Sequence, residues 1–387
     1  MLSNAVKHIL TIALFLCTGA IVRSEPFVPK DSAQELEKLR ATAFDPAHQE
    51  LREWRAKLAA QPTNPAVAAH FVRLCIDKYR NESDPRYLGR AQAALAPWWN
   101  AGEAPAEILV LRATIKQSLH EFTNALADLD AAIRLDGRNP QAWLTKATIL
   151  TVLGDYKDAR RACLPLAQLA PGLIAVTAAV SVTSLNGEAE RSCNLLKNAL
   201  NGSTSASASE RIWALNVLAE TYERLGRNAE AETFFKSAMA LGKRDPYLLG
   251  AYSDLLLDMG RPQEVVELLK NETRADGLLL RLALAEAAIT PRPALCQTHI
   301  TELQARFEAG HLRGDFVHQR EEARFQLRLL HDPKEALRLA QANWLAQHEP
   351  ADVRILHEAA VAAGDPQADQ LALDFVHNNR LEDIALK

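Results

Sequence analysis

The sequence predicts an all-α fold in which antiparallel helix pairs are stacked one on another. The first observation is internal repetition: the pattern of small and apolar residues that begins at Ala106 returns 34 residues later, at Pro140. The second is composition, since aromatic residues are only 6% of the 387 residues and alanine is abundant. This suits closely approaching helices better than a β-sandwich. Stacked repeats bury one continuous core, so chain length alone does not set the number of domains.

Residues 1–24 have the features of a signal peptide. Lys7 and His8 precede an apolar run from Ile9 to Val22, and a cleavage site follows before Glu25. The run spans 14 residues, whereas a membrane span needs about 20. We therefore expect an exported chain, periplasmic or secreted. An uncleaved N-terminal segment that holds the chain at the inner membrane is the alternative.

Residues 25–105 are expected to form an N-terminal helical region with degenerate repeats. The pairs Asp45-Pro46, Asn64-Pro65 and Asp84-Pro85 divide this region, because proline is well tolerated in the first turn of a helix. Helices are expected at about 32–43, 47–60, 65–80 and 86–96.

Five clear repeats follow, at residues 106–139, 140–172, 173–206, 212–245 and 246–272. The match is most complete from Ile212, where the expected slots hold Leu215, Leu218, Ala219, Tyr222, Leu225-Gly226, Ala231, Phe235 and Ala238. A 34-residue period with these small and aromatic slots resembles the tetratricopeptide repeat, a helix–turn–helix unit. The resemblance implies a right-handed superhelical solenoid that serves as a protein-binding scaffold. Together with the signal peptide, it suggests an exported protein of the bacterial type.

The repeat slots have a physical reason. Small residues such as Ala219 and Ala231 let two helices approach closely, and each helix pair leaves an apolar face that the next repeat covers. Two interruptions are expected to alter the stack locally. Pro165 should kink a second helix, and the polar stretch 201–209 should form an exposed loop.

Residues 273–387 are expected to be degenerate C-terminal helical repeats and a cap. A separate helical domain after about residue 275 is the alternative. Helices are expected at about 276–288, 293–308, 315–331, 333–347, 351–363 and 366–378.

No motif for catalysis, cofactor binding or metal binding stands out. His120-Glu121 and His357-Glu358 open like a zinc-protease motif, but Asn124 and Val361 occupy the closing positions. We expect His120 to be a solvent-exposed turn residue. The sequence contains no glycine-rich phosphate loop and no nucleophile motif. The chain is therefore predicted not to be an enzyme.

The four cysteines that follow the signal peptide are expected to be core residues. Cys75, Cys163, Cys193 and Cys296 lie far apart and form no metal-ligand pattern. A Cys163–Cys193 disulfide is the less favoured alternative. Neighbouring helix axes lie about 8–10 Å apart, whereas a disulfide needs Cα atoms within about 7 Å.

The net charge disfavours nucleic-acid or anionic-membrane surfaces as partners. The formal net charge is −4, and removal of residues 1–24 takes away Lys7 and Arg23 to give −6. No cluster of lysine and arginine stands out. No integral membrane span is expected after signal cleavage.

The family that the chain resembles binds an extended peptide or a partner helix on its concave face. In such repeats, fixed positions of each first helix line the groove. The residues that fall on these positions, and that we predict to contact a partner, are Gln117, Gln141, Leu144, Thr148, Thr177, Ser181, Trp213, Asn216, Glu220, Glu223, Tyr247 and Asp254.

The predicted groove changes character along the chain. It is apolar and rich in hydroxyls in its middle, then acidic with two aromatic residues. Val110, Leu144 and Thr177 stand where relatives that clamp a carboxylate begin their basic clamp. A neutral-to-basic extended segment with Trp213 as an anchor fits better. The alternatives are that these residues are merely solvated or cover a capping segment of the same chain.

These observations predict a non-enzymatic scaffold in the cell envelope that binds a protein or peptide partner of unknown identity in the concave groove. The alternative is an accessory or regulatory subunit of an envelope enzyme or transport complex. A hydrolase with an unrecognised site is a third hypothesis.

Overall fold

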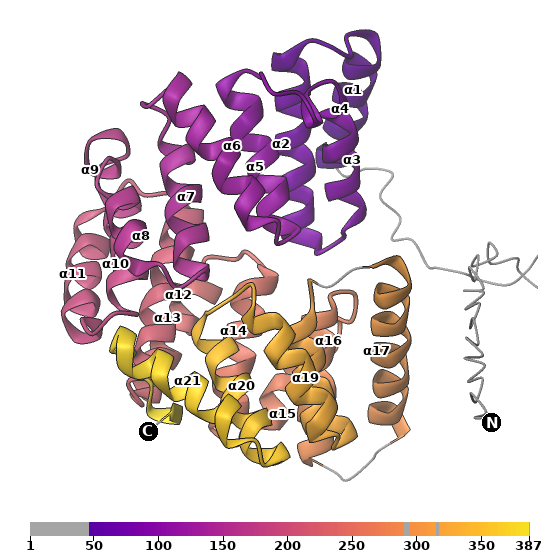
Figure 1. Cartoon of the computed structure of the whole chain (residues 1–387), viewed down its shortest axis with the longest axis vertical. Helices are drawn as coiled ribbons and strands as arrows, with labels where there is room; N and C mark the ends of the chain where they lie inside the picture. The colour runs from indigo at the N-terminus through magenta and orange to yellow at the C-terminus, as the bar shows by residue number, and fades with distance from the viewer. Residues whose placement is uncertain (1–45, 290–293, 315–316, 387) are drawn as a thin grey trace, which may run out of the picture. The chain divides into compact units, whose positions relative to one another are not determined.

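The chain folds into α-helices joined by short turns, and successive helices pair in antiparallel fashion (Figure 1). The computed structural model describes residues 46–289, 294–314 and 317–386. No strand occurs among these residues. The predicted signal peptide and the predicted helix at 32–43 lie outside them. The first helices are α1 (Pro46–Ala60), α2 (Pro65–Glu82), α3 (Arg86–Ala94) and α4 (Ala96–Trp99).

The central repeats form the helix pairs that the sequence predicts. The slot residues Ala219, Tyr222, Ala231 and Phe235 are all buried. The helices are α5 (Ala106–Ser118), α6 (Phe122–Leu135), α7 (Pro140–Val152), α8 (Tyr156–Cys163), α9 (Leu166–Leu169), α10 (Leu173–Thr183), α11 (Ala189–Gly202), α12 (Ala208–Arg224), α13 (Asn228–Met239), α14 (Pro246–Asp258) and α15 (Pro262–Leu269).

The two expected interruptions both occur, but the loop in the polar stretch is shorter than expected. Helix α8 ends at Cys163 and α9 begins at Leu166, so the second helix of this repeat is broken at Pro165. The polar stretch is shorter as a loop than predicted, because α11 continues to Gly202 and α12 begins at Ala208.

The C-terminal helices follow the predicted order. Within the segment predicted at 315–331, residues 319–325 form an α-helix that continues into one turn of π-helix, η1, at residues 326–330. The elements are α16 (Asp276–Ile289), α17 (Ala294–Arg313), α18 (Gln319–Phe325), η1 (Gln326–Leu330), α19 (Pro333–Trp344), α20 (Pro350–Ala363), α21 (Pro366–Asn379) and the 3₁₀ turn η2 (Ile384–Leu386).

Asparagine–proline and aspartate–proline pairs start several helices. The side chains of Asn64, Asn139, Asp245 and Asp365 each accept hydrogen bonds from backbone N–H groups in the first turn. The proline that follows each one lacks the N–H that would have no partner there. These dipeptides fix where four helices begin and explain why their starts could be read from the sequence.

The described residues from Glu50 onward form the larger of two compact units. The helices after residue 275 share the core of the larger unit with the central repeats. One buried cluster contains Ala147 and Leu185 from the repeats together with Ala336 and Leu356 from the C-terminal helices. Among the described residues, no helix combines the length and apolar character of a membrane crossing.

The C-terminal helices pack against the turns of the central repeats (Figure 1). The backbone N–H of His348 donates to the carbonyl oxygen of Val152 over 2.7 Å. The side-chain amide of Asn186 donates to the carbonyl oxygen of Asn379 over 2.8 Å. The chain therefore covers part of its own repeat surface.

Glycine in three successive repeat turns makes this approach possible. Gly154, Gly187 and Gly226 have φ values of 75°, 75° and 74°, in the left-handed region that glycine tolerates. A Cβ atom at Gly154 would lie 2.9 Å from the ring of Phe375, and one at Gly187 would lie 3.1 Å from Arg380. Helix α21 and the segment after it thus run along consecutive turns of the solenoid.

Candidate functional site

Helix α12 places three predicted groove residues on one face. Asn216, Glu220 and Glu223 are spaced by four and three residues, so they share one side of the helix. A capping box between Ser207 and Glu210 fixes the start of this helix. The face therefore has a defined position relative to the repeat core.

Helix α14 adds an aromatic residue and two carboxylates opposite this face. The hydroxyl of Tyr247 donates a 2.5 Å hydrogen bond to the Glu220 carboxylate. Tyr247 is nevertheless 61% exposed. Asp254 and Asp258 lie seven and eleven residues further along, on the same side of α14. In the part of the chain that the structure describes, Glu220 has no ion pair, and Tyr247 is its hydrogen-bond partner.

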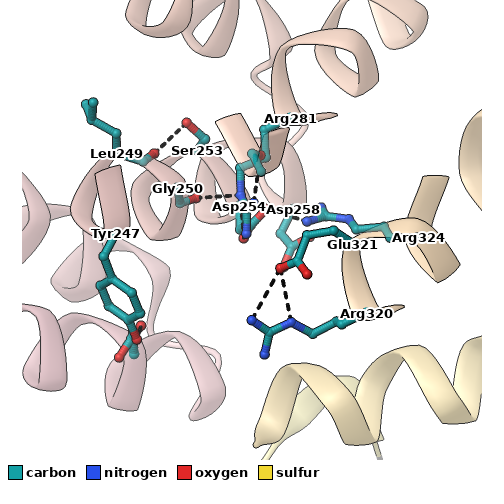
Figure 2. A network of polar contacts seen from close by, with 12 residues as sticks. Tyr247, Leu249, Gly250, Ser253, Asp254, Asp258, Arg281, Arg320, Glu321 and Arg324 are labelled. Carbon is teal, nitrogen blue, oxygen red and sulfur yellow. Dashed lines mark hydrogen bonds and ion pairs between the residues drawn. The ribbon is translucent and has the colours of Figure 1, made fainter. Parts of the chain in front are cut away.

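Arginines from the C-terminal third neutralise part of this acidic surface (Figure 2). Asp254 accepts from Arg281 of α16 over 2.9 Å and from Arg324 of α18 over 2.6 Å. Arg354 of α20 lies 3.2 Å from Glu223. The acidic end of the predicted groove is therefore covered in part by the chain itself, which was one of the alternatives left by the sequence.

A second set of ion pairs centres on Arg320 of α18. Its guanidinium lies 2.8 Å from Glu349 and 3.3 Å from both Glu321 and Asp352. Figure 2 shows Arg320 and Glu321 on the side that faces α14. Asn343 donates to Asp352 over 2.8 Å, which holds this buried carboxylate in place.

We name these facing charges the inner polar cluster. It contains eight carboxylates and five guanidinium groups, so three carboxylates are in excess. The members are Glu220, Glu223, Asp254, Asp258, Glu321, Glu349, Asp352, Asp383, Arg224, Arg281, Arg320, Arg324 and Arg354.

Burial is the largest influence on the pKa values of these carboxylates, and neighbouring charges modify it. Burial raises the pKa of Glu220 to about 6, although the hydrogen bond from Tyr247 and the charge of Arg224 oppose this. Burial raises the pKa of Glu223 to about 8 against the charge of Arg354, with help from Asp258 and Asp254. Burial also acts on Asp254, but the two guanidinium groups beside it hold its pKa below its usual value.

Other predicted groove residues differ in accessibility. Gln141 and Thr148 are exposed and bond locally, to Thr145 and to the Leu144 carbonyl. Gln117, Leu144, Ser181 and Trp213 are half-buried. Leu144 and Trp213 pack against the core.

Two of the predicted residues are buried in the core rather than on the accessible surface. Thr177 is 0% exposed, and its hydroxyl donates to the carbonyl oxygen of Leu173. Asn216 is 4% exposed, and its Oδ1 atom has no hydrogen-bond partner among the described residues. Both side chains are thus inaccessible to a partner in this conformation.

The repeat pattern did not reveal Arg320, Arg324 and Arg354, because the C-terminal helices follow it poorly. The signal that could have revealed two of them is their spacing. Arg320 and Arg324 are four residues apart and therefore share one face of a helix.

His120 and His311 each have a side-chain partner in the structure. His120 is half-buried, stacks on Phe122 and lies 3.1 Å from the amide of Gln347. The expectation that it is solvent-exposed was wrong, because α19 is followed by a segment that covers this turn. His311 pairs with Glu322 over 2.8 Å. No group of three or more potential ligands suited to a metal ion occurs within the described residues.

The cysteines have the structural role that the sequence predicts. Cys75, Cys163, Cys193 and Cys296 are all buried with free thiols, so the alternative Cys163–Cys193 disulfide is not formed.

Comparison with known proteins agrees with this architecture. The family model described as tetratricopeptide repeat matches residues 214–241, which include most of α12 and all of α13. The chain therefore contains a tetratricopeptide repeat, and its all-α solenoid fold is of the kind that such repeats form. No curated protein matches its sequence significantly.

Solved structures of similar architecture include two bacterial proteins and one human protein. A thermophilic tetratricopeptide repeat protein of Thermus thermophilus is 20% identical, with 48% of this chain and 97% of that chain covered and a TM-score of 0.38. A tetratricopeptide repeat protein of Parabacteroides merdae is 14% identical, with 67% and 92% covered and a TM-score of 0.42. A human IFIT1 dimer with m7Gppp-AAAA is 14% identical, with 86% of each chain covered and a TM-score of 0.41.

Proposed function

We propose that this chain is a non-enzymatic scaffold of the cell envelope that holds a segment of a partner protein on the inner faces of α12 and α14. The repeat fold supports a role in protein interaction. The observation that carries the proposal is Tyr247, a large aromatic side chain that is 61% exposed beside the carboxylate of Glu220. Aromatic residues of this kind are typical anchors of interfaces, because they offer apolar area with a polar end.

The envelope setting rests on the features of residues 1–24. Its test is fractionation of cells that produce the full chain, followed by N-terminal sequencing of the product. Release into the periplasm or medium with a new N-terminus near Glu25 supports export. A product that stays in the cytoplasm with residues 1–24 attached contradicts it.

The interaction is tested by photo-crosslinking from Tyr247 in the full chain. p-Benzoylphenylalanine replaces Tyr247 in one variant and, as a control, Leu164 in another, since Leu164 is 72% exposed at the junction of α8 and α9. We expect one discrete adduct from position 247, absent from position 164 and prevented by Glu220→Lys. Mass spectrometry then identifies the partner, and the purified pair is tested for binding.

Equal adducts from both positions, or none from position 247, would contradict the proposed surface. A stoichiometric complex with an envelope enzyme or transporter would assign the chain to an accessory or regulatory role.

A further inference from the structure

The inner faces of α12 and α14 offer hydrogen-bond acceptors that the chain does not satisfy. Glu220 receives a hydrogen bond from Tyr247 and forms no ion pair among the described residues. A carboxylate can accept more than one hydrogen bond, so a cationic donor supplied by a ligand can form a charge-assisted hydrogen bond with Glu220 beside the one from Tyr247.

The charge balance of the inner polar cluster also favours a cationic ligand. The inner polar cluster has three carboxylates in excess, and Glu220 is one that no arginine reaches within an ion-pair distance in the described part of the chain. Glu349, which caps the start of α20, and Asp254 of α14 act on Glu220, which strengthens the negative potential around it. Arg224, four residues along α12, instead hydrogen-bonds to Ser184 and Thr221. A cation that enters this region meets more negative than positive charge.

The side chains around Glu220 favour an organic cation with an apolar stem. Tyr247 presents an exposed aromatic ring next to the carboxylate, and such rings attract ammonium and guanidinium groups and pack against their stems. A bare metal ion is less suited, because the described residues contain no cluster of ligands for one.

From these observations we infer that the partner segment carries a lysine or arginine, whose cationic group binds Glu220 while its stem packs on Tyr247. This inference rests on the proposed function and specifies the partner's chemistry. The site takes several donors at once, which suits an extended segment with a long basic side chain better than a single hydroxyl or amide.

The test uses the purified full chain and a library of acetylated, amidated heptapeptides with five randomised positions. Peptides that the immobilised chain retains are sequenced by mass spectrometry. We expect lysine or arginine to be enriched at one or two positions. For the best peptide, Glu220→Gln should weaken binding about tenfold or more, since a hydrogen bond to a charged group is lost.

Two controls separate binding from folding. Glu267→Gln removes an outer carboxylate whose side chain is 74% exposed and should leave the affinity unchanged. Tyr247→Phe retains the ring, so its affinity should fall less than that of Tyr247→Ala. Circular dichroism of each variant verifies that the helices are intact.

The results distinguish the inference from the function on which it rests. If the retained peptides are acidic or apolar and their binding still depends on Tyr247, the inference of a cationic side chain is wrong, but the proposed binding surface stands. If peptides are retained equally well without the Tyr247 ring, both the inferred cationic contact and the proposed binding surface are wrong. If spermidine binds as tightly as the best peptide and competes with it, the site recognises a small polyamine and the peptide assignment fails.

Proton release gives an independent readout. A cation beside Glu220 and Glu223 lowers their raised pKa values, so binding near neutral pH should release protons. Calorimetry in two buffers of different ionisation enthalpy measures this release. Binding without release, or with proton uptake, contradicts the inferred contact.

Discussion

The ring of Phe375 lies against Gly154, so that a Cβ atom at this glycine would come within 2.9 Å of it. The two residues belong to α21 and to the turn between α7 and α8. Together with the His348–Val152 hydrogen bond, this contact joins the C-terminal helices to the central repeats. A single substitution at Gly154 can therefore test this contact between the C-terminal helices and the central repeats.

Gly154→Ala should destabilise the protein through two additive effects. A non-glycine residue at a φ of 75° costs about 1–2 kcal/mol, and the contact with Phe375 adds about 1–3 kcal/mol of overpacking. Gly260→Ala is the matched control, since Gly260 has a φ of 68° in an equivalent turn but no atom within 4 Å of an added Cβ. Urea unfolding compares the variants, and equal losses would show that Phe375 adds nothing.

Arg354→Met should be strongly destabilising, because it removes a cation shared by buried carboxylates. The guanidinium lies 2.8 Å from Asp383, whose side chain is 0% exposed, and 3.2 Å from Glu223. Removal of one partner from a buried pair costs about 3–5 kcal/mol. Arg338→Met is the control, since Arg338 is 58% exposed in its pair with Glu335 and should cost about 0–1 kcal/mol. Similar urea midpoints for the two variants would contradict this.

The helix pairs could be predicted from the sequence because their determinants are local. Small residues such as Ala219 and Ala231 recur at repeat spacing, and Asp245-Pro246 specifies both a helix start and its cap. The covering of the inner surface could not be predicted in this way. Arg354 and Glu223 are in contact although they are 131 residues apart in the sequence. No local pattern predicts such a contact, because it depends on the arrangement of all the helices between the two residues.

Ala231→Trp should overpack the interface between α12 and α13. Ala231 is 0% exposed, and the added ring has no space between two closely approaching helices. The expected cost is about 1–3 kcal/mol or more. Ala229→Trp is the control on the same helix, because Ala229 is exposed. Thermal melts followed by circular dichroism measure both, and an unchanged midpoint for Ala231→Trp would contradict the repeat register.

The four buried thiols should resist alkylation in the native protein. Burial raises the pKa of Cys75 to about 12 and those of Cys163 and Cys193 to about 11, and it raises that of Cys296 as well. The reactive thiolate is therefore scarce at mildly alkaline pH. Peptide mapping after iodoacetamide treatment should find these sites modified only when urea is present. Rapid modification of Cys163 in the native chain would show that the α8–α9 break opens.

Glu223→Gln should gain stability relative to the unaltered protein as pH rises. Burial raises the pKa of Glu223 to about 8, so between its ordinary value and pH 8 the folded chain holds a proton that the unfolded chain has lost. The folded state is then favoured at the low end of this window, and that contribution disappears as pH rises through about 8. Glutamine cannot ionise and avoids this loss.

Glu232→Gln is the matched control with the opposite sign. Hydrogen bonds from Arg261 and Lys236 lower the pKa of Glu232 to about 2. Its contribution is therefore present above the ordinary carboxyl pKa and disappears as pH falls toward about 2, so Glu232→Gln should be less stable than the unaltered protein at neutral pH. Urea unfolding at a series of pH values measures both differences. Stability curves that run parallel for Glu223→Gln and the unaltered protein would contradict the raised pKa, and would show that the charge of Arg354 offsets the burial of Glu223.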